Sequence, residues 1–96
     1  MSRFRLRRAA EEDLVGIAEY TIERWGEDQA DAYIAQFDRA FHELAKKPET
    51  GRHADEVRPG YLRHHVGRHM IYFRRIRGGI EIVRVLHDRM SPRRHL

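Results

Sequence analysis

Two apolar-rich runs joined by a short glycine turn constrain what this chain can fold into. Residues 69–76 and 80–87 are rich in β-branched and aromatic side chains, and Arg77, Gly78 and Gly79 lie between them. Runs of this kind on either side of a glycine pair predict a β-hairpin. Two adjacent glycines suit the two positive-φ positions of a type I′ turn, so we expect that turn here.

Alternation along the predicted hairpin gives it two apolar faces. Every second residue of a strand lies on the same face of the sheet. The first strand divides into Met70, Tyr72, Arg74 and Ile76 against Ile71, Phe73 and Arg75, and the second into Ile80, Ile82, Arg84 and Leu86 against Val83, Val85 and His87. Because both sets are apolar near the strand centres, we expect something to cover each face.

Length and composition exclude several classes of protein. Ninety-six residues suffice for one domain with one modest core. The chain has no cysteine, which excludes disulfides, thiolate catalysis and cysteine-based zinc sites. No apolar run is long enough to span a membrane, and residues 1–5 lack the hydrophobic region of a signal peptide. We therefore expect a cytoplasmic protein with no membrane contact.

Charge is segregated along the chain. Residues 1–8 carry four arginines and no acid, residues 9–47 have a net charge of −6, and residues 48–96 have a net charge of +6. A genomic bias toward arginine would explain the choice of Arg over Lys but not this segregation. The pattern favours a basic surface that meets an anionic partner.

Residues 4–8 alternate apolar and basic side chains and predict a short strand, at a sheet edge or beside a hairpin strand. A helix is predicted over residues 9–25, ended by Gly26. Its apolar stripe is Ala10, Leu14, Ile17, Ala18, Thr21 and Trp25. A second helix is predicted from an N-cap at Asp28 to the stop at Pro48. Two helices so closely joined form a hairpin that can cover one sheet face.

Residues 48–60 form a polar connection with turn signals, and residues 61–66 predict a third strand that Gly67 turns into the hairpin. The predicted fold class is α+β: an N-terminal strand, a two-helix hairpin and a three-stranded antiparallel meander, with the helices packed on one sheet face. Residues 1–96 make a single domain, with residues 88–96 as a basic C-terminal tail. The other sheet face is left bare.

Seven histidines raise the question of a metal site. His64, His65, His69 and His87 could lie on neighbouring strands, but no helical histidine pair with a glutamate is present. Nearby arginines would also repel a divalent cation. We expect no metal and no cofactor, and exposed or half-packed histidines on the strands.

The basic half also holds the residue types of metal-free ribonucleases, in which Arg binds the scissile phosphate and His or Tyr moves protons. These residues are Arg63, Arg68, Arg74, Arg84, His87 and Tyr72. A solvated basic face is the alternative interpretation. Tyr20, Trp25 and Tyr33 lie among acidic residues, so we expect them in helix packing rather than stacked on bases.

Two stretches resemble the ParE toxins of the RelE/ParE superfamily. The first is residues 10–14 with Ile17, the Tyr20-Thr21 pair, residues 24–26, Gln29 and Tyr33, and the second is residues 84–90 with His95 and Leu96. The resemblance covers nearly the whole chain. By these motifs the chain is identified as a member of the ParE-type toxins, the toxin half of a type II toxin–antitoxin pair.

The superfamily has two activities, and the resemblance favours one of them. RelE-like members are ribosome-dependent mRNA endonucleases with an Arg before the middle strand's apolar run and a Tyr or His-Tyr at the end of the last strand. Here His69 falls at the Arg position, with Arg68 adjacent, and Asp88 follows His87 where several nucleases have Tyr. An acid there would repel the scissile phosphate. ParE-like action instead stabilises the DNA-cleaved complex of DNA gyrase, which implies no catalytic residue in the toxin.

The resemblance implies two binding surfaces. For a ParD-like antitoxin with an acidic amphipathic segment, we predict the bare sheet face: Arg58, Arg63, Met70, Tyr72, Arg74, Arg75 and Leu86. For gyrase, its bound DNA or both, we predict the basic C-terminal side: Arg84, His87, Arg89, Met90, Arg93 and Arg94. Two alternatives stay open, a RelE-type mRNA endonuclease and a member that retains only antitoxin binding or operator co-repression.

Overall fold

The computed structural model describes residues 3–96 and contains one five-stranded sheet in the order β1-β5-β4-β3-β2. The strands are β1 (Arg3–Leu6), β2 (Arg52–His53), β3 (Tyr61–Val66), β4 (His69–Ile76) and β5 (Gly79–His87). The helices are α1 (Arg8–Trp25), α2 (Glu27–Lys46), the 3-10 turn η1 (Pro48–Thr50) and α3 (Pro92–His95). The predicted α+β class is confirmed, and the two-residue strand β2 is an addition within the predicted polar connection.

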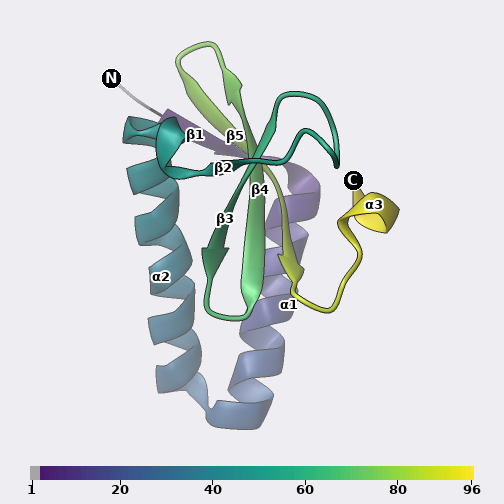
Figure 1. Ribbon diagram of the computed structural model, residues 1–96. Helices are drawn as coiled ribbons and strands as arrows, with labels where there is room; N and C mark the ends of the chain where they lie inside the picture. The colour runs from purple at the N-terminus through teal and green to yellow at the C-terminus, as the bar shows by residue number, and fades with distance from the viewer. Residues whose placement is uncertain (1–2) are drawn as a thin grey trace.

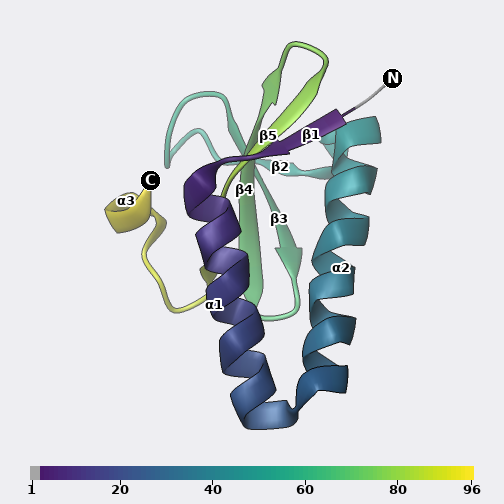
Figure 2. The same ribbon diagram turned by 180° about the vertical axis from the view of Figure 1, so that it is seen from behind.

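Strand β1 lies at the sheet edge and pairs in parallel with β5, whereas β2, β3, β4 and β5 pair antiparallel. Phe4 and Leu6 of β1 pack against the core, so Arg3 and Arg5 lie on the opposite face. The chain passes from β1 through the helical hairpin before it returns to the sheet. Both long helices lie on the same face of the sheet, as Figures 1 and 2 show from opposite sides.

The β4–β5 turn differs from the predicted type I′ turn. Ile76 pairs with Gly79, so Arg77 and Gly78 form the loop, and of these two residues only Gly78 has positive φ, at 85°. A type I′ turn needs positive φ at both positions. Gly79 is required for a different reason: a Cβ there would collide with the backbone oxygen of Arg3. The second glycine lets the edge strand approach.

A β-bulge in β5 overturns the predicted division of its side chains. Tyr72 pairs with Arg84 and Phe73 with Ile82, which leaves Val83 as the extra residue. Val85 consequently joins Ile80 and Ile82 in the core under the helices, while Val83 lies in a separate cluster on the other face. Strict alternation was wrong for β5 because one inserted residue exchanges the faces of all that follow.

The helical hairpin turns at Gly26, whose φ is 92°. Gly26 ends α1 as predicted, but it also serves as the N-cap of α2, so the prediction of Asp28 as that cap was wrong. The expectation that Tyr20 and Trp25 take part in packing was also wrong, because they are 57% and 66% exposed. Both belong to the last two turns of α1, and this end of the helical hairpin extends beyond the sheet (Figure 1).

The main core lies between the helices and the sheet. Its largest fully buried members are Phe37, Phe41, Phe73, Leu44, Ile71, Ile80 and Ile82. Leu62 of β3 joins this core, so its neighbour Tyr61 lies on the opposite face.

The prediction of a bare second face was wrong. Tyr61, Val83 and Ala54 form a second buried cluster, with Val57 and Leu96 packed against it. The polar connection folds back through hydrogen bonds from Val57 and Arg58 to the Ala54 carbonyl, and Leu96 arrives from the C-terminal segment. Tyr72 and Leu86 are buried as well, at only 5% and 1% exposed.

Within residues 3–96, no helix has both the length and the apolar character needed to cross a membrane.

Candidate functional site

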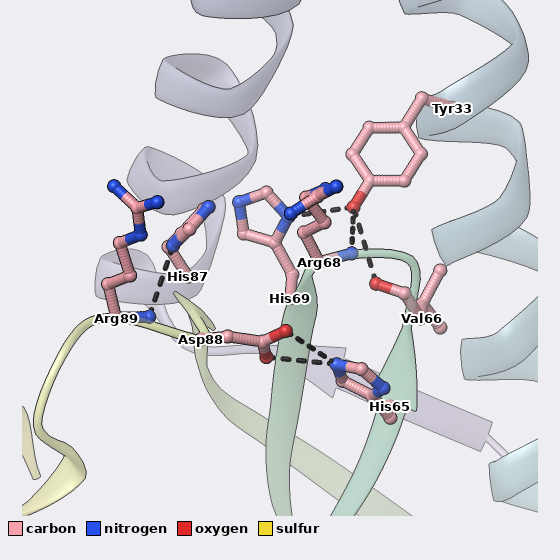
Figure 3. A network of polar contacts seen from close by, with 8 residues as sticks. All are labelled: Tyr33, His65, Val66, Arg68, His69, His87, Asp88 and Arg89. Carbon is pink, nitrogen blue, oxygen red and sulfur yellow. Dashed lines mark hydrogen bonds and ion pairs between the residues drawn. The ribbon is translucent and has the colours of Figure 1, made fainter.

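Three histidines gather where β4 begins and β5 ends. We call His65, His69 and His87, together with Tyr33 and Asp88, the histidine cluster; Figure 3 shows it with its neighbours. The β3–β4 turn and the pairing of His69 with His87 bring these residues together from three strands and α2. The expectation that histidines lie on neighbouring strands is confirmed for these three.

Tyr33 joins α2 to the β3–β4 turn. Its hydroxyl oxygen lies 2.7 Å from Nδ1 of His69 and accepts a hydrogen bond of 3.1 Å from the Arg68 amide, and it lies 3.3 Å from the Val66 carbonyl oxygen. A Cβ at Gly67 would meet the Tyr33 ring, so glycine is needed for this approach. Tyr33 is therefore packed as predicted, and it also fixes the turn that carries His69.

The rings of His69 and His87 meet edge to face, with centroids 5.2 Å apart. Next to them, Nε2 of His65 lies 2.9 Å from both carboxylate oxygens of Asp88 (Figure 3). Nδ1 of His87 accepts the Arg89 amide at 3.1 Å. These contacts hold the chain in place as it leaves β5 for the C-terminal tail.

The environment of this cluster limits its acid–base chemistry. Burial, with a smaller contribution from His87, lowers the pKa of His69 to about 4, so its ring is neutral near pH 7. Burial also raises the pKa of Tyr33 above its usual value of 10. Neither group is poised to donate a proton at neutral pH. The Asp88 carboxylate adds negative charge where a scissile phosphate would need a positive one.

The side chain of Arg84, which was predicted to contact gyrase, is mostly buried, with 19% exposed. Its Nε and Nη2 donate to the two carboxylate oxygens of Asp13 at 2.7 and 2.8 Å, and its Nη1 donates to the His95 carbonyl oxygen at 3.0 Å. Asp13 also accepts the Val85 amide at 2.9 Å, beyond the end of β1. Arg84 therefore joins α1, β5 and α3.

The other residues predicted for gyrase lie along the chain after β5. Arg89, Arg93 and Arg94 are exposed, Met90 is 37% exposed, and His87 is half-buried in the histidine cluster. The structure thus brings five of the six together on one segment after β5 and at its start, whereas Arg84 supports that segment from β5 through its hydrogen bond to the His95 carbonyl.

The residues predicted for the antitoxin divide into three groups. Arg58 is exposed and Met70 is half-buried, whereas Tyr72 and Leu86 are buried. Arg63 lies 3.3 Å from Glu56, Arg74 donates to Glu81, and Arg75 lies 3.8 Å from Glu49. Arg75 has the strand parity of Ile71 and Phe73, so it points to the helical side. Because Tyr72 and Leu86 are buried, the expectation that they form an exposed apolar centre of the antitoxin surface was wrong.

Sequence reasoning missed a cluster of arginines around Glu81, which is 6% exposed. Arg5, Arg7 and Arg74 each donate to its carboxylate, at 3.1, 2.8 and 2.8 Å. One signal was available: Glu81 is the single acid inside an apolar strand, and a buried acid needs partners. Asp13 carried a similar signal that we attributed to the helix dipole.

Within the part of the chain that the structure describes, no group of three or more His, Asp and Glu residues is arranged to hold a metal ion.

Comparisons with known proteins place this geometry in a family. A family profile described as "ParE toxin of type II toxin-antitoxin system, parDE" matches residues 4–92. "Toxin ParE1" of Mycobacterium tuberculosis (strain CDC 1551 / Oshkosh) is 42% identical over 99% of this chain and 98% of its own length. "Toxin ParE1" of Caulobacter vibrioides (strain ATCC 19089 / CIP 103742 / CB 15) is 36% identical over 100% and 99%.

A solved structure described as "Chromosomal ParDE TA system from P. aeruginosa" shares the fold. Its TM-score is 0.77 at 19% identity, over 91% of this chain and 96% of the other. The profile match across nearly the whole chain and the two full-length relatives agree with the resemblance seen in the sequence. This chain belongs to the ParE toxin family of type II toxin–antitoxin systems.

Proposed function

We propose that this protein inhibits DNA gyrase by stabilising the DNA-cleaved complex, and that a ParD-like antitoxin neutralises it in the cytoplasm. The observation that carries this proposal is the family match over residues 4–92. The chemistry of the histidine cluster supports a binding protein rather than a nuclease. The His69 ring is neutral near pH 7, and the His65 ring is already in contact with the Asp88 carboxylate at 2.9 Å.

The proposed gyrase surface is the exposed C-terminal segment. Arg89, Arg93 and Arg94 present three cations with Met90 beside them, rooted at His87. A basic segment of this kind suits an acidic protein surface or DNA held by gyrase. Arg84 has a supporting role here, because its hydrogen bond to the His95 carbonyl holds the segment in place.

The proposed antitoxin surface is the sheet face opposite the long helices. Arg58, Arg63 and Arg74, with Arg75 at the margin, would pair with acidic side chains, and half-buried Met70 would supply apolar contact. Tyr72 and Leu86 would contribute only after the residues that cover this face move. Binding of the antitoxin is thus expected to displace Leu96 from its cluster.

A gyrase supercoiling and cleavage assay with the purified chain tests the proposal. We expect inhibition of supercoiling and accumulation of cleaved DNA, both reversed by the cognate antitoxin. Arg93→Gln/Arg94→Gln should weaken inhibition by about ten-fold or more, because two charge-assisted contacts are lost. Arg24→Gln/Arg39→Gln, on the exposed helices, is the control with the same change in net charge.

Equal loss of inhibition in both double variants would indicate general charge rather than the C-terminal segment. We also predict that deletion of residues 88–96 abolishes toxicity. The point variants are the more specific test. The deletion would also remove the Leu96 side chain from Ala54, Tyr61 and Val83 and the His65–Asp88 contact, so loss of activity could follow from altered folding.

One observation favours the alternative of a ribosome-dependent mRNA endonuclease: His69 contacts both Tyr33 and His87, next to exposed Arg68. Incubation of the chain with translating ribosomes tests it. Discrete transcript cuts that disappear in His87→Gln or Arg68→Gln would establish the nuclease and refute the gyrase proposal. Normal transcripts together with cleaved DNA would have the opposite meaning.

A further inference from the structure

We propose that the arginines around Glu81 form a second binding site, one that takes the phosphodiester backbone of duplex DNA. The site consists of Arg5 and Arg7 from the β1 region and Arg74 from β4, with Arg3 and Arg77 next to it, and it shares only Arg74 with the surface proposed for the antitoxin. It lies at the β1 edge and the β4–β5 end of the sheet (Figures 1 and 2), and its apolar neighbours Tyr61 and Val83 also contact Leu96 at the end of the C-terminal segment.

Glu81 organises the site. Oε1 accepts hydrogen bonds from Arg7 and Arg74, and Oε2 accepts one from Arg5. Arg5, Glu81 and Arg74 are also in register across β1, β5 and β4, so the backbone sets their spacing. A single buried carboxylate thereby holds three guanidinium groups in fixed positions before any ligand arrives.

The three arginines have capacity left for a ligand. Each guanidinium has five N–H donors and gives one to Glu81, and one negative charge leaves two of the three positive charges uncompensated. Their side chains are 65%, 41% and 41% exposed, in the order Arg5, Arg7 and Arg74. Arginine binds phosphate oxygens through paired N–H groups, so this arrangement suits a phosphodiester.

Neighbouring residues extend the site along the strand. Arg3 and Arg5 lie on one face of β1, about 6.6 Å apart along the strand, so both can reach the same nucleic-acid strand. Arg3, Arg5 and Arg77 also line an open pocket of about 490 Å³ at the β4–β5 turn. Together they form a row of cations that can follow a backbone.

Nucleic acid fits this site better than an acidic protein segment does. A protein segment gains most of its affinity from apolar anchors, but Tyr61 and Val83, the apolar neighbours on this face, are only 6% and 2% exposed. Affinity here must come almost entirely from charge, which is how a protein holds a phosphate backbone. The acidic helices lie on the opposite face and would orient the duplex toward this side.

Fluorescence anisotropy with the purified chain and a labelled DNA duplex of about 20 base pairs tests the proposal. We expect binding that weakens between about 50 and 200 mM salt. Arg3→Gln/Arg5→Gln should bind about ten-fold or more weakly and reduce the slope of log K against log salt by about 1.8, because two phosphate contacts are lost. Arg24→Gln/Arg39→Gln is the control with matched charge, and circular dichroism checks that both variants fold.

Three results would overturn the proposal: no binding of the duplex by the unmodified chain, equal weakening in the two double variants, or binding of the unmodified chain to polyglutamate but not to the duplex. The last would assign the site to an acidic protein partner. None of these results depends on gyrase inhibition, so failure of this proposal and failure of the gyrase proposal are distinguishable.

Discussion

Burial of the His69 ring makes the fold sensitive to acid. The ring packs between Phe37 and His87, and burial lowers its pKa to about 4 from the ordinary 6.5. Stability from this residue is complete above pH 6.5 and is lost as the pH falls to 4, because only the unfolded chain gains the proton. We expect the free energy of unfolding to fall over this range by up to about 3 kcal/mol.

Urea denaturation at several pH values measures that fall, and His69→Gln should flatten it because the substituted residue does not titrate. His42→Gln is the control, since His42 is an exposed histidine on α2. An unchanged pH dependence in His69→Gln would contradict this explanation.

Glu81 is a buried acid whose neutralisation should be costly. Burial raises its pKa, but hydrogen bonds from Arg74 and Arg7 outweigh burial and lower the pKa to about 2. Its contribution to stability is present above pH 4.5 and disappears as the pH falls toward 2. At pH 7 we expect Glu81→Gln to lose about 2 kcal/mol, because three arginines then face one another without a counter-charge. Exposed Glu49→Gln should change stability by less than about 0.5 kcal/mol.

At the scale of elements, Asp13 completes the sheet where β1 stops. Leu6 is the last paired residue of β1, and beyond it the Asp13 carboxylate accepts the Val85 amide and holds Arg84. We expect Asp13→Ala to lower the free energy of unfolding by about 3 kcal/mol, because it leaves a mostly buried guanidinium unpaired. Urea denaturation measures the loss.

The neighbouring Glu12→Gln is a matched control for Asp13→Ala, since Glu12 is exposed and lies 3.9 Å from Arg8. We expect a change below about 0.5 kcal/mol. Asp13→Ala should also speed amide hydrogen exchange in α3, which depends on Arg84 through the His95 carbonyl. Unchanged exchange there would show that Leu96 alone holds the tail.

For the whole molecule, the C-terminal segment ties the two proposed partner surfaces together. Leu96 packs with Tyr61 and Val83 on the sheet face proposed for the antitoxin, while the segment that carries it is proposed to contact gyrase. We therefore predict that the partners exclude one another. Immobilised gyrase should capture the free chain and fail to capture a preformed toxin–antitoxin complex. A stable ternary complex would contradict this prediction.

Local signals identified most elements to within one or two residues. The periodicity of α1 and α2, the stop at Gly26 and the β4–β5 hairpin follow from side-chain spacing and turn chemistry, which are properties of neighbours in the chain. Trp25 shows the limit of periodicity: it continues the apolar stripe of α1 but lies beyond the sheet, where nothing covers it.

The sequence by itself determined the α+β class, the order of the main elements, the separation of charge and, through its motifs, the family. Only the tertiary structure decided the bulge at Val83, the cover over the second sheet face, and the pairings of Arg84 with Asp13 and of three arginines with Glu81. The physical reason is range. Helix and turn preferences act between neighbours, whereas these contacts join residues up to 76 positions apart, and only the folded chain brings them together.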